Sequence, residues 1–122
     1  MESTAGRFDE IVLGEAREAF ARGRLVEARF AFERAFEGAS DRRDAETMAR
    51  AVLGLGGLWV NEQRAPDEYA QYRAQLTDTL QALGGTNGVL SARVNVRLTA
   101  EARYAEGAQI EDARRALARV QS

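Results

Sequence analysis

Hydrophobic side chains recur every three or four positions along almost the whole chain, which is the spacing of amphipathic helices. Residues 66–83 show this spacing clearly, with an apolar face made of Tyr69, Tyr72, Leu76, Leu80 and Leu83. Valines stand singly rather than in the alternating runs that are typical of strands. We therefore predict an all-α fold with six helices, over residues 7–22, 25–37, 42–63, 66–83, 90–106 and 110–121.

Glycines interrupt this pattern at intervals, and we interpret them as helix ends, because glycine readily adopts the left-handed conformation found there. These glycines are Gly23, Gly38, Gly84, Gly85 and Gly107. Pro66 marks a helix start, since proline has no N–H to lose in the first turn. Short connections predict a single domain, residues 1–122, of three antiparallel hairpins over residues 7–38, 42–83 and 90–121.

Three residue types that carry much of enzyme chemistry are missing: the chain has no Cys, no His and no Lys, so all 17 basic residues are Arg. This excludes zinc sites built from Cys and His, thiol nucleophiles, imidazole bases and lysine-dependent phosphate loops. The two carboxylate groupings that most resemble a metal site, Asp41 with Asp44 and Glu111 with Asp112, lie at predicted helix starts, where acids stabilise the helix dipole. We predict no catalytic residue, no metal site and no cofactor.

The net charge of -2 and a pI near 5.3 argue against a broad phosphate-binding surface, so we expect no nucleic-acid partner. The longest uncharged apolar run, residues 51–60, is too short to cross a bilayer. The segment MESTAGRFDE carries acids and no apolar core, unlike a signal peptide. We expect a soluble, cytoplasmic protein without membrane association. We also expect a bacterial origin, because arginine without lysine is typical of GC-rich coding.

Two distant segments, residues 18–35 and 102–120, share a pattern. In each, an aromatic residue precedes a glycine by three positions. Small and large apolar residues follow at equal spacing, which gives Ala28, Phe32 and Ala35 in the first and Ala113, Leu117 and Val120 in the second. The middle hairpin fits this frame when Trp59 is aligned with Phe20. Three hairpins with a period of about forty residues indicate a helical repeat.

The first hairpin resembles a tetratricopeptide repeat. The residues that carry this resemblance are Ala16, Gly23, Leu25, Ala28, Phe32 and Ala35. The later hairpins depart from the consensus and lack its closing proline. The segments LGLGGLWVNEQR and RLTAEARY are similar to the degenerate helical arms of bacterial signalling ATPases and transcriptional regulators. The resemblance implies a right-handed stack of hairpins that binds a ligand or a protein and does not catalyse a reaction.

Residues 51–64 place three glycines inside an apolar run. A phosphate-binding loop would need a strand before the glycines and a helix after them. A helical pattern precedes them here, so we interpret Gly54, Gly56 and Gly57 as small residues that let a neighbouring helix approach closely. Each costs about 1 kcal/mol of helix propensity relative to alanine.

In a tetratricopeptide-like stack the first helix of each hairpin lines the concave face. This mapping predicts a groove lined by Glu10, Leu13, Arg17 and Phe20, by Ala49, Val52, Gly56 and Trp59, and by Val94, Arg97, Glu101 and Tyr104. The polar residues that follow Trp59 would form one rim of the groove. The structural alternative is that the aromatic side chains are buried between the helices and the groove is empty.

We predict a non-catalytic protein- or peptide-interaction module that serves as a regulatory or scaffolding arm. Its predicted binding residues are Arg17, Phe20, Trp59, Asn61, Glu62, Arg64, Arg97, Glu101 and Tyr104. The alternative function is a small helical metabolite-binding protein or enzyme with its site near Trp59. The first helix carries Phe8, Ile11 and Val12, so self-association through that end is a secondary hypothesis.

Overall fold

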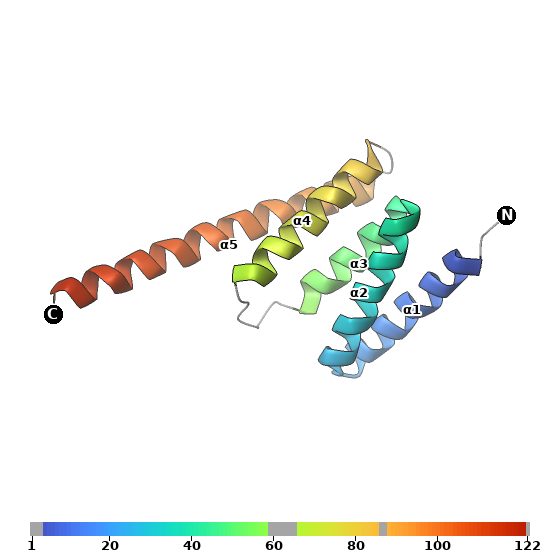
Figure 1. The fold of residues 1–122 in the computed structure, drawn as a ribbon, viewed down its shortest axis with the longest axis horizontal. Helices are drawn as coiled ribbons and strands as arrows, with labels where there is room; N and C mark the ends of the chain where they lie inside the picture. Colours follow the sequence, from blue (N-terminus) through green and yellow to red (C-terminus); the bar gives the residue numbers. More distant parts are fainter. Residues whose placement is uncertain (1–3, 59–65, 86–87, 122) are drawn as a thin grey trace.

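The structure is a computed structural model that describes residues 4–58, 66–85 and 88–121. Within these residues the chain forms five helices and no strand (Figure 1). The helices are α1 (Thr4–Ala21), α2 (Leu25–Arg42), α3 (Ala45–Leu58), α4 (Pro66–Leu83) and α5 (Gly88–Gln121). The predicted all-α fold is confirmed.

Consecutive helices run in opposite directions, and α3 lies at the centre, in contact with each of the other helices (Figure 1). Its sequence explains this position, because AETMARAVLGLGGL holds one acid and one arginine among small and apolar residues. The buried residues of α3 are Thr47, Met48, Ala49, Ala51, Val52, Leu55, Gly56 and Leu58. A helix that is apolar on most sides must be surrounded, and the other four helices provide that cover.

Small side chains let α1 and α2 pack closely against each other. Ala16 of α1 and Ala28 and Ala35 of α2 are fully buried, and Phe32 of α2 is 3% exposed. These four residues belong to the motif that carries the resemblance noted in the sequence. The motif positions therefore form part of the hydrophobic core.

Left-handed backbone conformations follow three of the helices. Gly23, after α1, has a φ of 76°, and Gly84 and Gly85, after α4, have φ values of 55° and 85°. Glycine adopts this conformation without steric cost, as the sequence predicted at these turns. After α2 the left-handed residue is Arg43, with a φ of 54°. The positions of the glycines in the sequence could not predict this turn.

Two predicted helix ends are wrong. Gly38 lies inside α2, which continues to Arg42, and Gly107 lies inside α5. As a result residues 90–106 and 110–121, predicted as the two helices of a hairpin, form one continuous helix. One glycine in a helix interior costs only about 1 kcal/mol, which the alanine, glutamate and glutamine residues around Gly107 offset.

The start of α3 is set by Asp44, whose side chain caps the helix. A carboxylate oxygen of Asp44 accepts a hydrogen bond from the backbone N–H of Thr47 at 3.3 Å, and the other accepts one from the Thr47 hydroxyl at 2.7 Å. This satisfies a backbone donor that has no partner within the helix. Asp44 thus acts at a helix start as predicted, whereas Asp41 lies in the last turn of α2.

A buried acid of α1 holds the end of α2. Asp9 is 3% exposed and accepts an ion-paired hydrogen bond from Arg42. Arg42 also donates to the backbone oxygen of Gly38 at 3.3 Å and to Asp44 at 3.4 Å. The bond to Asp9 raises the pKa of Arg42 above its ordinary value, so the guanidinium stays charged at any pH at which proteins are folded. This cluster joins α1, α2 and the start of α3.

The 34 residues of α5 make it the longest described helix, at about 50 Å for a rise of about 1.5 Å per residue. Its first half packs beside α4, and its second half extends past the end of α4 (Figure 1). No helix in the described ranges is both long enough and apolar enough to cross a membrane.

We expect the substitution Gly38→Ala to destabilise the fold. A Cβ at this position would lie 2.5 Å from a carboxylate oxygen of Asp9, which would have to move away from Arg42. Overpacking of this kind costs about 1–3 kcal/mol, more than the propensity that alanine adds to a helix. Urea denaturation followed by circular dichroism measures the change in the free energy of unfolding.

Gly14→Ala is the matched control, because Gly14 also lies inside a helix and a Cβ there would meet nothing within 4 Å. It should raise the free energy of unfolding by up to about 1 kcal/mol. Equal shifts of the same sign in both variants would contradict the packing of Asp9 against Gly38.

Candidate functional site

A groove crosses α3 between α1 and α5. Its first part, called the arginine pocket below, has a volume of about 320 Å³ and is lined by Arg17, Phe20, Phe32, Arg50, Leu53, Gly54, Gly57, Leu90 and Arg93. The second part, of about 470 Å³, is lined by Leu53, Gly57, Ala92, Arg93, Val96, Arg97 and Ala100. Leu53, Gly57 and Arg93 belong to both parts, so the two form one continuous groove.

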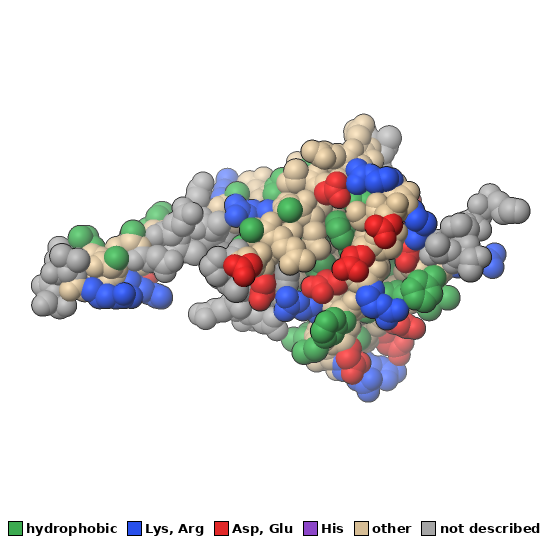
Figure 2. Space-filling view, in the orientation of Figure 1, with side chains coloured by type: hydrophobic (Ala, Val, Ile, Leu, Met, Phe, Trp, Pro, Cys, Tyr) green, Lys and Arg blue, Asp and Glu red, His purple; other side chains and the backbone are tan. Residues whose placement is uncertain are grey.

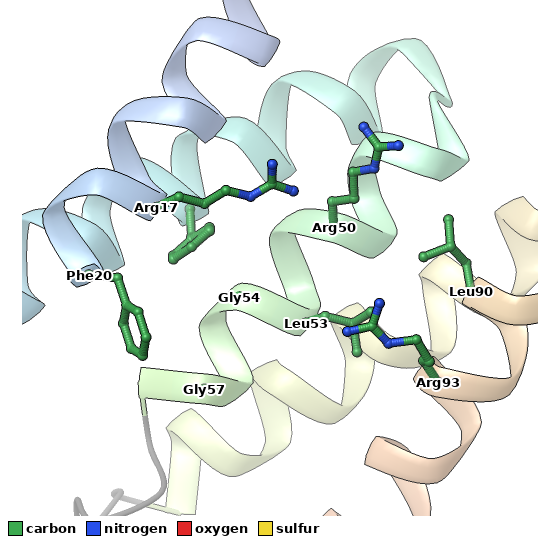
Figure 3. A pocket seen from close by; sticks show the side chains of 9 residues that line it. Arg17, Phe20, Arg50, Leu53, Gly54, Gly57, Leu90 and Arg93 are labelled. Atoms are coloured by element: carbon green, nitrogen blue, oxygen red, sulfur yellow. The ribbon is translucent and has the colours of Figure 1, made fainter.

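Arginines from three helices surround the arginine pocket (Figure 3). Arg17 from α1 and Arg93 from α5 extend toward each other across α3, and Arg50 projects from α3 itself. Arg50 is ion-paired with Glu46 one turn earlier in α3. Within the described ranges Arg17 and Arg93 make no ion pair and no side-chain hydrogen bond, and both are exposed. Their donors therefore face solvent at the pocket.

The floor of the arginine pocket is apolar. Phe32 of α2 and Leu90 of α5 are 3% and 8% exposed, and Leu53 of α3 is half-buried. Phe20 of α1 stands at the edge with 44% of its surface exposed. None of the described residues that line this pocket is acidic. The pocket thus combines positive charge at its mouth with apolar surface beneath.

The three glycines of α3 lie inside a helix, which excludes a phosphate-binding loop at this place. Gly54 and Gly56 serve packing, as predicted, but against side chains rather than against the backbone of a neighbouring helix. A Cβ at Gly54 would overlap the ring of Phe32, and a Cβ at Gly56 would overlap the hydroxyl group of Tyr72. Gly57 remains exposed and leaves space in both parts of the groove.

Arg97 and Glu101, both predicted to bind a partner, join α5 to α3. Glu101 is 2% exposed and pairs with Arg97 at 2.8 Å. The same Nη2 of Arg97 donates to the backbone oxygen of Gly56 at 3.0 Å, and the guanidinium lies 5.9 Å from the ring centre of Tyr72. Arg97 retains 27% of its side-chain exposure and lines the second part of the groove, whereas Glu101 is buried beneath it.

The other predicted binding residues are distributed as follows. Arg17 and Phe20 lie together at the arginine pocket. Trp59, Asn61, Glu62 and Arg64 fall in residues 59–65, outside the described ranges, as does the side chain of Tyr104. The predicted aromatic row is therefore represented in the described structure by Phe20 alone.

Two arginines of the groove, Arg50 and Arg93, were missed because the predicted register was wrong. The mapping placed Ala49 and Val52 of α3 and Val94 of α5 in the groove, and all three are fully buried. On both helices the residue next to a predicted one faces the groove, since one residue corresponds to about 100° of rotation around a helix.

One signal in the sequence could have identified Arg50. It is the only charged residue after Glu46 in α3, a helix whose other side chains are small or apolar. A lone arginine in such a helix must reach solvent, so it marks the open side of the helix. Neighbouring groove residues then follow at Leu53, Gly54 and Gly57, which are three, four and seven positions away.

The described lining of the groove offers cationic and apolar contacts. It consists of arginines, apolar residues and glycines, without an acid, a hydroxyl group or an amide. No cluster of three or more His, Cys, Asp or Glu residues in the described ranges could hold a metal ion. The arrangement can hold a ligand that is anionic and partly apolar.

Glu101 is buried and its partner Arg97 is partly buried, so we expect Glu101→Ala to cause a large loss of stability. Removal of the carboxylate leaves the arginine charge without compensation beside α3, which costs about 3 kcal/mol of unfolding free energy. The exposed pair of Glu111 and Arg114, at 3.8 Å, offers the matched control. Glu111→Ala should change stability by less than about 0.5 kcal/mol. Chemical denaturation distinguishes the two, and similar small effects would show that the buried pair does not hold α5 in place.

Comparison with protein families, with curated proteins and with solved structures finds no match for this chain.

Proposed function

We propose that this protein is a non-catalytic interaction module of tetratricopeptide-like type, whose groove binds an extended peptide segment of a partner protein. The segment is acidic and carries a large apolar side chain. The observation that supports this most directly is the arginine pocket, where Arg17, Arg50 and Arg93 surround an apolar floor and no described acidic residue lines the site.

The charges favour a carboxylate-bearing ligand. Arg17 and Arg93 have no ion-pair partner in the described structure, and their guanidinium groups extend toward the same space (Figure 3). A guanidinium group donates two parallel hydrogen bonds to a carboxylate, a geometry that gives both strength and specificity. A carboxylate between the two helices would also relieve the repulsion among the three arginines.

The size and the surface of the arginine pocket favour a peptide side chain over a cofactor. A volume of about 320 Å³ is at the lower end of the range for small-molecule sites, which is about 300–1,000 Å³. The exposed ring of Phe20 and the half-buried Leu53 offer apolar contact at the mouth. One large apolar side chain with acidic neighbours would occupy this space.

The distribution of charge over the molecule supports the choice of this surface. Acidic side chains gather on a different face, over α2 and α4 (Figure 2). There Glu37, Asp41 and Asp78 line a hollow of about 430 Å³. An acidic segment would be repelled from that face and attracted to the arginines, although the net charge of the chain is only -2.

The arrangement of the helices supports the tetratricopeptide-like part of the proposal. The groove has its walls on α1 and α3, which are the first helices of two successive antiparallel pairs, and on α5, which follows the second pair. In a right-handed stack of hairpins these helices line the concave face. The motif residues Ala16, Ala28, Phe32 and Ala35 are buried, as close packing within such a hairpin requires.

The test is the affinity for a short fluorescent peptide in which one phenylalanine is flanked by glutamates, measured by fluorescence anisotropy. Arg17→Glu and Arg93→Glu should each weaken binding by at least about tenfold, since a charge-assisted hydrogen bond contributes about 1.5–3 kcal/mol. Added salt should weaken binding by the wild-type protein.

Arg73→Glu is the matched control, because Arg73 is exposed on α4, away from the groove, and the charge change is the same. It should change the affinity less than about twofold. Equal binding of a peptide flanked by lysines, or an equal loss in all three variants, would count against the groove. A response of Trp59, the sole tryptophan, to small metabolites without any peptide binding would favour the metabolite-binding alternative.

A further inference from the structure

The second half of α5 projects from the rest of the molecule. The buried residues of this helix, Leu90, Val94 and Glu101, all lie in its first half. After Glu101 every side chain of α5 that the structure describes is exposed. Most of the stability of a protein helix comes from the packing of an apolar face rather than from helix propensity. We therefore expect the projecting half to pack against another surface.

An apolar stripe runs along α5 at intervals of seven residues or a multiple of seven. Its members are Val89, Val96, Ile110 and Leu117, which are 72%, 71%, 54% and 59% exposed. Arg103 occupies the position between Val96 and Ile110. A repeat of seven residues is the spacing at which two helices wind around each other in a coiled coil.

This stripe is symmetric about Arg103. Val96 and Ile110 are seven residues before and after it, and Val89 and Leu117 are fourteen residues before and after it. The same surface would therefore match itself when reversed. Self-complementarity of this kind is what an interface between two identical chains around a twofold axis requires.

We propose that α5 is a dimerisation helix and that its partner is a second copy of this chain, packed antiparallel with the twofold axis near Arg103. Val89 of one copy then faces the region of Leu117 in the other, and Val96 faces that of Ile110. The projecting half of each α5 covers the exposed first half of the other α5. A single interface therefore buries both halves of the apolar stripe. A parallel pair would instead place helices α1 to α4 of both copies at the same end of the dimer.

Arg103 limits the strength of this dimer. The two guanidinium groups meet near the axis, where like charges repel, although their long stems let them turn toward solvent. A single polar residue in a coiled-coil seam lowers stability while it fixes the register. The dimer is accordingly a reversible one.

The first hairpin offers a weaker surface for self-association. Phe8 and Ile11 of α1 are 53% and 61% exposed, but Val12 is only 2% exposed and belongs to the core. The guanidinium of Arg34 lies 5.7 Å from the ring centre of Phe8. The exposed apolar residues there show no symmetric spacing like that of α5.

Sedimentation equilibrium over a range of protein concentrations tests the proposal. Ile110→Glu should weaken dimerisation at least tenfold, and Arg103→Leu, which completes the stripe, should strengthen it at least tenfold. Val26→Glu is the matched control, because Val26 is an exposed β-branched residue on α2 (69%, against 54% for Ile110), and it should leave the dimer unchanged. Ile110 does not line the groove, so Ile110→Glu removes no contact between the groove and a peptide.

Disulfide trapping tests the orientation, since the chain has no cysteine of its own. A mixture of the Val89→Cys and Leu117→Cys variants should yield a mixed disulfide between the two chains, and neither variant alone should cross-link efficiently. A protein that stays monomeric at every concentration, a dimer insensitive to Ile110→Glu, or efficient cross-linking of Val89→Cys with itself would each overturn the proposal.

Discussion

The burial of α3 is the constraint on which the rest of the structure depends. The side chains of this helix are small or apolar on most sides, so four other helices must pack around it. Its glycines then let large side chains come close to its backbone: the ring of Phe32 at Gly54, and Tyr72 with Arg97 at Gly56. The hydroxyl group of Tyr72 donates to the backbone oxygen of Val52 at 2.7 Å. One helix therefore positions α2, α4 and α5, and the groove lies on its remaining open side.

Most of the secondary structure could be read from hydrophobic spacing, because α1, α2 and α4 each bury one face and show it in the sequence. The glycines were harder to interpret. A glycine serves either a turn or a close approach, and only its neighbours in space decide which. Gly23 ends a helix, whereas Gly38 lies within one because the carboxylate of Asp9 occupies the space of a side chain. That acid is 29 residues away in the sequence, so no local pattern reveals it.

The candidate site was predictable to the extent that the register of each helix was known. The register of α1 came from its own motif. It places Arg17 and Phe20 beside the same pocket, but Leu13, which it also placed in the groove, is 4% exposed and belongs to the core. The registers of α3 and α5 came from alignment of aromatic residues between hairpins. On a helix, an error of one residue turns a groove position into a core position. Arg50 and Arg93 were lost in this way, while Arg97 and Glu101 were found but form a buried link between helices.

The groove and the apolar stripe meet on the first half of α5. Arg93 reaches into the arginine pocket, and Val96, one turn further along, borders the second part of the groove and also belongs to the stripe. A contact that stabilises the helical conformation of this half of α5 therefore favours both ligand binding in the groove and dimerisation through the stripe. By thermodynamic linkage, a ligand that binds the ordered helix better than a frayed one promotes dimerisation, and dimerisation strengthens ligand binding by the same factor. The continuous helix through Gly107 makes this coupling available, because a hairpin closed at that glycine would cover the stripe within a single chain.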